Sequence, residues 1–76
     1  MRERYFVTLD RDGKADSIFR SLENGSLTLE FLGVGRWVED ADLFAEYTGE
    51  SPGAREVSAA EARQAANALG WSWPAG

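Results

Sequence analysis

The side chains that could do chemistry in this sequence are carboxylates, arginines, one lysine, hydroxyls and two tyrosines, because the chain has neither histidine nor cysteine. The commonest general base and the thiolate ligands of structural metal sites are therefore missing. The densest carboxylate run could hold a hard cation through oxygen atoms. It contains Glu39, Asp40, Asp42 and Glu46. A helix start explains the same run, since aspartates stabilise the positive end of a helix. We therefore predict no metal, no cofactor and no enzymatic activity.

Arg20 is a charged residue on a strand face that is otherwise expected to be apolar. Its predicted neighbours across the sheet are Tyr5 and Leu29. A fully buried guanidinium without a partner would carry a prohibitive desolvation cost. We expect Arg20 to pair with a carboxylate such as Asp42 or Glu46. The alternative is that Arg20 marks the site of a bound anion.

Five aromatic residues are candidates for contact with a partner. Phe6 and Phe19 are expected side by side on the sheet face opposite the core, where an apolar patch needs a cover or a partner. Trp71 and Trp73 lie in the closing stretch GWSWPAG, and Trp37 lies near a sheet edge. Two tryptophans can bury on the order of 150–250 Å² each. We expect the tail to fold back near Trp37 or on the Phe6 and Phe19 patch, and the alternative is a free tail that docks on a partner.

The net charge of −5 is uneven, because residues 37–76 hold seven acidic and two basic residues while residues 1–36 are balanced. An acidic surface argues against non-specific binding to nucleic acid, which needs a basic face. No stretch approaches the roughly 20 apolar residues of a membrane-spanning helix, and the start MRERYFVTLD does not read as a secretory signal. We therefore expect a cytoplasmic location, no membrane and no nucleic acid.

The elements that must position these residues begin with three strands between residues 4 and 32, joined by two tight turns. Asp12-Gly13 is expected at the tip of a two-residue turn. Asn24-Gly25 is typical of the type I′ hairpin turn, in which both central residues have positive φ. The three strands then form an antiparallel meander.

These turns predict the register, since a slip of one residue turns every side chain to the other face. The first turn pairs Val7 with Ile18 and Tyr5 with Arg20. The second turn pairs Ile18 with Phe31. The predicted core face consists of Tyr5, Val7, Leu9, Ile18, Leu22, Leu27, Leu29 and Phe31.

The second half of the chain reads mainly as helix. Residues 36–38 could add a short fourth strand, and helices are expected over about 41–48 and 59–69, with the loop GESPGARE between them. Ser58 and Glu61 have the spacing of a capping box, and Gly70 stands where a left-handed C-cap belongs. The expected fold is a single α+β domain over residues 1–76. In it, a three-stranded meander is packed on one face by two C-terminal helices, and an aromatic tail follows over 71–76.

The runs YFVTLDRDGKADSIFR, GRWVEDADLFAEYTGE and EVSAAEA resemble a group of small uncharacterised proteins of high-GC Gram-positive bacteria. That resemblance implies the same architecture and no particular activity. The chain is also similar in shape to MbtH-like proteins, which dock on adenylation domains through tryptophans. Their tryptophan–proline motif follows the second strand, whereas here Trp73-Pro74 lies at the far end, so only the shape is analogous.

These observations favour a small, non-catalytic protein-binding or accessory module that acts on another protein through an aromatic surface. The alternative is an acidic decoy that mimics nucleic acid toward a basic partner. A net charge of −5 is modest for such a mimic, since duplex DNA carries one charge every ~1.7 Å.

Overall fold

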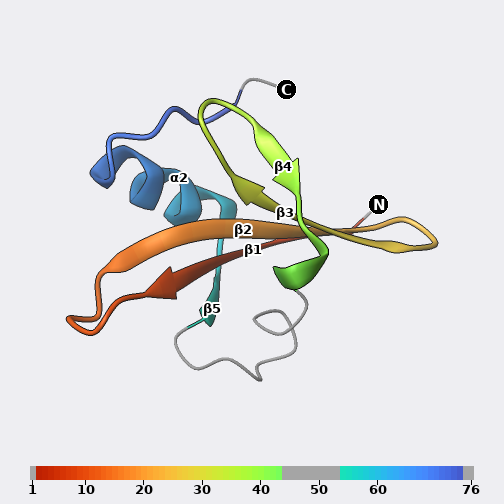
Figure 1. Ribbon diagram of the computed structural model, residues 1–76, viewed down its shortest axis with the longest axis horizontal. Helices are drawn as coiled ribbons and strands as arrows, with labels where there is room; N and C mark the ends of the chain where they lie inside the picture. Colours follow the sequence, from red (N-terminus) through yellow and green to blue (C-terminus); the bar gives the residue numbers. More distant parts are fainter. Residues whose placement is uncertain (1, 44–53, 75–76) are drawn as a thin grey trace.

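The computed structural model describes residues 2–43 and 54–74, which form a five-stranded antiparallel sheet with one α-helix (Figure 1). The elements are β1 (Arg2–Leu9), β2 (Ala15–Glu23), β3 (Leu27–Leu32), β4 (Trp37–Glu39), the 3₁₀ helix η1 (Ala41–Leu43), β5 (Ala54–Val57) and α2 (Ala59–Ala68). The strand order is β4-β3-β2-β1-β5. The α+β class and the short fourth strand are confirmed.

The pairing of β1 with β2 agrees with the predicted register, although the turn between them does not. Val7 lies opposite Ile18 and Tyr5 lies opposite Arg20. The two-residue turn is wrong, because the loop closes through a hydrogen bond from the Asp10 N–H to the Lys14 carbonyl. A register shift beside Leu9 then restores the predicted alignment for the rest of the hairpin.

The predicted pairing of β2 with β3 is wrong by one residue. Glu23 lies opposite Leu27, so three residues form the turn, and Phe19 rather than Ile18 lies opposite Phe31. A type I′ turn needs positive φ at both central residues, but only Gly25 has it, at 78°, and no described non-glycine residue does. Every side chain of β3 therefore faces the side opposite to the prediction.

This slip divides the predicted core between the two faces of the sheet. Leu27, Leu29 and Phe31 share the face of Phe6 and Phe19. Leu32 instead turns to the helix-covered face. There the buried cluster consists of Val7, Ile18, Leu32, Ala62 and Ala66. Both faces of the central strands are consequently buried.

The remaining differences lie between β4 and α2. β5 spans Ala54–Val57 and pairs with the open edge of β1, although residues 54–56 were expected in a loop. The helix expected over 41–48 appears in the described chain only as η1, and residues 44–48 lie outside the described residues. One α-helix is therefore described where two were predicted. Figure 1 shows η1 and α2 on opposite sides of the sheet.

The ends of α2 follow the local sequence signals. The Glu61 N–H donates to the Ser58 hydroxyl at 3.1 Å, and the Ser58 N–H donates to the Glu61 carboxylate at 3.1 Å, which completes the capping box. These bonds hold the pKa of the Glu61 carboxyl below its usual range. At the other end Gly70 has φ 74°, and the Trp71 N–H donates to the Ala66 carbonyl at 2.8 Å. This Schellman motif turns the chain back toward the sheet.

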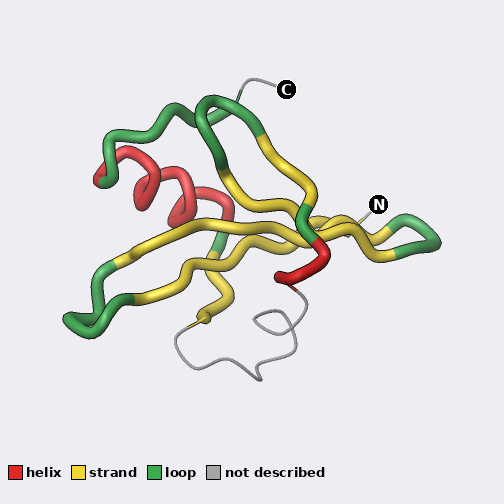
Figure 2. The backbone as a smooth tube through the Cα atoms, viewed as in Figure 1, coloured by secondary structure: helices red, strands yellow, loops and turns green. Residues whose placement is uncertain are grey.

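The helix lies against β1 and β2 (Figure 2). Its residues Ala62 and Ala66 are fully buried. Such small side chains bring the helix backbone close to the sheet but bury little area. The partly buried rings of Trp37, Trp71 and Trp73 pack around the same cluster. In the described part of the chain, no helix is long and apolar enough to cross a bilayer.

The observed register allows two leucines to be compared on the sheet face that carries Phe6 and Phe19. Leu29 is 5% exposed and Leu27 is 39% exposed, although both lie on the same strand and point to the same face. Leu29→Ala should lower the free energy of unfolding by about 2–5 kcal/mol, because it leaves a buried cavity. Leu27→Ala should cost clearly less. Urea unfolding of both variants measures the difference, and equal losses would contradict this burial pattern.

Candidate aromatic binding cleft

Three aromatic rings from distant parts of the chain meet at one end of the helix-covered face. Tyr5 comes from β1, Trp37 from β4 and Trp73 from the tail. The Trp37 and Trp73 ring centroids are 5.4 Å apart in a T-shaped arrangement, and Tyr5 lies 5.8 Å from Trp73 and 6.1 Å from Trp37. All three side chains remain partly exposed. The cluster therefore combines structural packing with accessible aromatic surface.

The tail reaches this cluster because α2 ends in a tight reversal. After Gly70 the chain runs back over the sheet (Figure 1). Trp71 and Trp73 both pack against the core. The expected folding back near Trp37 is confirmed. The alternative docking position on the Phe6 and Phe19 patch is wrong, because that patch lies on the other face.

Arg20 has a carboxylate partner, but not one of those expected. Its Nε donates to Oε1 of Glu30 at 2.8 Å, and its Nη2 forms an ion pair with the same oxygen at 2.8 Å. The two side chains are only 17% and 18% exposed. Asp42 was the wrong choice because β3 is shifted by one residue, which places Glu30 directly opposite Arg20. Glu46, the other expected partner, lies outside the described residues.

The Arg20 guanidinium also packs against the aromatic cluster. Its central carbon lies 4.4 Å from the centroid of the Trp37 ring. A guanidinium stacked at this distance is attracted to the negative face of an indole. Arg20 therefore holds Trp37 in place, while Glu30 neutralises the charge of the Arg20 guanidinium. The role of Arg20 in this structure is to stabilise the fold.

A cleft of about 430 Å³ opens beside these rings. Its lining is formed by Glu3, Tyr5, Arg20, Leu22, Trp37, Arg63, Trp73 and Pro74. The exposed Arg63 of α2 places its guanidinium carbon 5.4 Å from the Trp73 ring centroid. Within residues 2–43 and 54–74 it has no ion-pair partner. The cleft is thus walled by aromatic rings and carries an available cation at its rim.

The hydroxyl of Tyr5 stays protonated at neutral pH. It donates to Oε2 of Glu3 at 3.0 Å. Partial burial, together with the hydrogen bond and the negative charge of Glu3, raises the pKa of Tyr5 above its ordinary value of 10.0. Tyr5 is therefore a neutral hydrogen-bonding group in this cleft.

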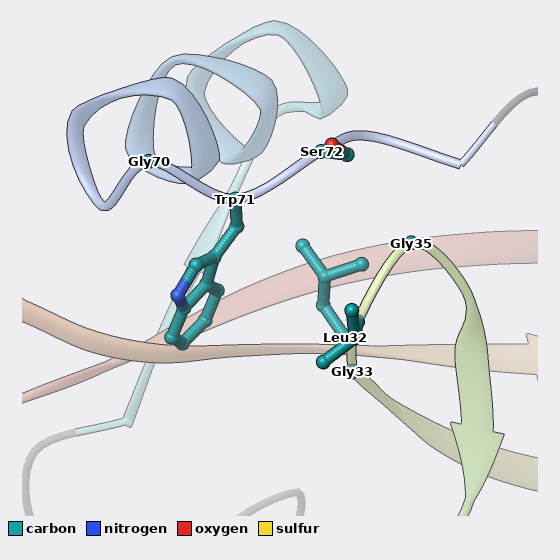
Figure 3. A pocket seen from close by; sticks show the side chains of 7 residues that line it. Leu32, Gly33, Gly35, Gly70, Trp71 and Ser72 are labelled. Carbon is teal, nitrogen blue, oxygen red and sulfur yellow. The ribbon is translucent and has the colours of Figure 1, made fainter.

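The other sequence-predicted aromatic residues lie elsewhere. Phe6 and Phe19 stack at 4.8 Å, but they are 6% and 0% exposed, so neither offers a surface to a partner. Trp71 lines a separate cavity of about 300 Å³ between the tail and the β3–β4 turn (Figure 3). That cavity has no titratable side chain in its lining, and Val34 at its rim is fully exposed.

In its described part, the acidic run after β4 stabilises the start of the 3₁₀ helix η1. Oδ1 of Asp40 accepts a hydrogen bond from the Asp42 N–H at 2.9 Å, as expected at a helix start. Across the described ranges, no group of three acidic side chains is placed to hold a metal ion.

Sequence reasoning found Trp37 and Trp73 but missed Glu3, Tyr5 and Arg63 as neighbours in one cleft. Tyr5 was assigned to the core, and Arg63 had no local signal, because its position depends on where the tail crosses the helix.

Two ion pairs between described strand residues, Arg20–Glu30 and Arg4–Glu56, should differ in strength. Arg20→Met should lower the free energy of unfolding by about 1.5–3 kcal/mol, because it leaves Glu30 partly buried without its charged partner. Arg4 pairs with Glu56 across β1 and β5, where the side chains are 29% and 50% exposed. Arg4→Met should cost only about 0–1 kcal/mol. Chemical denaturation at pH 7 compares them, and a larger loss for Arg4→Met would contradict the assignment.

The docked tail should contribute measurably to stability. Trp73→Ala should cost about 1–3 kcal/mol, because it removes two ring contacts and the stacking of Arg63. Truncation after Gly70 should cost more, since it also removes Trp71. Ser72→Ala, at an exposed position between the two, is the control. Melting temperatures of Trp73→Ala and of the truncated chain that equal that of the Ser72→Ala control would mean that the tail does not dock in solution.

Comparison of the chain with protein-family models, with curated proteins and with solved structures gave no match. The resemblance to small proteins of high-GC Gram-positive bacteria and the analogy of shape to MbtH-like proteins stay predictions. The chemistry of the aromatic cleft is therefore the basis on which a function can be argued.

Proposed function

We propose that this chain is a non-catalytic protein-binding module whose docking site is the aromatic cleft of Tyr5, Trp37 and Trp73. The observation that carries the proposal is the combination of three partly exposed rings with the available Arg63 guanidinium around one cleft. Tryptophan, tyrosine and arginine are the residues that most often dominate the energy of protein–protein interfaces.

The rigidity of the cleft supports this proposal. Trp37 is held between Arg20 and Trp73, and Trp73 is held between Trp37 and Arg63. Rings that are already ordered lose little conformational entropy when a partner binds. The tail therefore acts both as a stabilising segment and as one wall of the site.

The protonation states of the side chains that line the cleft support a binding function over proton-transfer catalysis. Its titratable groups are one carboxylate, one tyrosine and two arginines. Tyr5 has a raised pKa, which makes its hydroxyl a poor general base at neutral pH. Arginine remains protonated throughout the physiological range.

The acidic decoy has less support because several carboxylates already serve the fold. Glu30 binds Arg20, Glu56 binds Arg4 and Glu61 completes the helix cap. A nucleic-acid mimic needs its carboxylates displayed toward the partner at regular spacing. We therefore rank the decoy second.

Capture experiments from the native lysate, followed by titration of the purified partner, test the proposal. Arg63→Ala should weaken partner binding about tenfold or more, because it removes the available cation at the rim of the cleft. Arg55→Ala is the matched control, since Arg55 is also exposed on the same sheet face but lines a different cavity. It should bind like the unaltered protein.

Two results would contradict the proposal. One is equal binding by the unaltered protein and Arg63→Ala. The other is binding that collapses between about 50 and 200 mM salt and is insensitive to Arg63, which would identify the acidic decoy.

A further inference from the structure

The aromatic cleft offers more hydrogen-bond donors than acceptors to a ligand. Arg63 supplies an unpaired guanidinium at the rim. Among described residues that are not exposed, Ser21 Oγ is the buried side-chain polar atom without a partner. The indole N–H groups of Trp37 and Trp73 donate to no described residue, and neither is among the buried polar atoms without a partner. A ligand that fits this cleft should bring acceptors and flat apolar surface.

A proline-rich segment has that chemistry. Proline has no N–H, so its backbone presents carbonyl acceptors that no internal hydrogen bond uses. Its rings are apolar and pack on aromatic faces. The polyproline II conformation is already extended before binding, so little entropy is lost, and aromatic-lined grooves recognise such segments for this reason.

The chain itself places a prolyl ring in this cleft. Pro74 is partly buried and lines the cleft together with Tyr5, Trp37 and Trp73. A prolyl ring is therefore compatible with this lining.

The charges around the cleft indicate which kind of residue should flank the proline-rich segment. The described residues engage only Oε2 of Glu3, in the bond from the Tyr5 hydroxyl, so Oε1 can accept from a ligand cation. The net charge of −5 also attracts a basic segment over a longer range.

We propose that the aromatic cleft binds a proline-rich segment of the partner protein, with a basic flanking residue beside Glu3. This inference rests on the proposed function, because it names the chemistry of the partner at the same site. The prolyl rings pack on Tyr5, Trp37 and Trp73, and Arg63 donates to the carbonyls of the segment.

Fluorescence polarisation with labelled peptides tests the inference on the full chain. The probes are an oligoproline that ends in arginine, the same peptide with serine in place of every proline, and an acidic peptide of serine, phenylalanine and aspartate. The oligoproline should bind at least about tenfold tighter than the serine peptide. Arg63→Ala should weaken oligoproline binding severalfold, and Arg55→Ala should not change it.

Glu3→Gln tests the flank separately, because glutamine still accepts the hydrogen bond from Tyr5. The variant should lose the preference for the arginine-ended probe over an oligoproline that ends in glutamine. Circular dichroism melting of each variant shows whether the fold is retained.

The inference is overturned if the oligoproline and the serine peptide bind equally, or if neither binds at about 1 mM, the weakest affinity worth assigning to a specific site. It is also overturned if the acidic peptide binds best and loses its affinity in Arg63→Ala. In each of these cases the proposed function stands if partner binding depends on Arg63. Partner binding that is insensitive to Arg63 contradicts the proposed function itself, so the two failures are distinguishable.

Discussion

The constraint on which the rest of the structure depends is the need to pair Arg20, a charged side chain in the middle strand of a small sheet. Taking a guanidinium out of water is costly unless a carboxylate satisfies it. Only the observed register places Glu30 opposite Arg20. The same register turns Leu32 toward α2 and sends Leu29 and Phe31 to the other face. The Arg20–Glu30 pair is thereby linked to the choice of which apolar side chains of β3 lie on each face of the sheet.

The sheet consequently supports two apolar layers that are built differently. On one face Phe6 and Phe19 stack and fill the space with large rings. On the other face Ala62 and Ala66 let α2 approach closely, but they leave area at the edges that small side chains cannot cover. The tryptophans of the tail and of β4 cover it. This division explains why large aromatic residues appear at the very end of the chain.

The candidate cleft is a consequence of that packing. Trp37 and Trp73 are needed to complete the core, yet each is large enough to remain partly exposed. Arginines stack on both rings, and only Arg20 is neutralised by a described carboxylate. Residues that stabilise the domain therefore also form a rigid, donor-rich surface, and structure and proposed binding share the same side chains.

The sequence by itself determined the features that a few consecutive residues control. These are the alignment of β1 with β2, the capping box of Ser58 and Glu61, and the reversal at Gly70. Their hydrogen bonds and turns act within a few residues or along one alternating strand. The tertiary structure decided the register of β3, the addition of β5 to the open edge of β1, the partner of Arg20, the choice of Trp37 as the docking place of the tail and the meeting of Glu3 and Arg63 in one cleft. Those features depend on contacts between segments distant in sequence, and a local pattern cannot rank one long-range pairing above another that buries a similar apolar area.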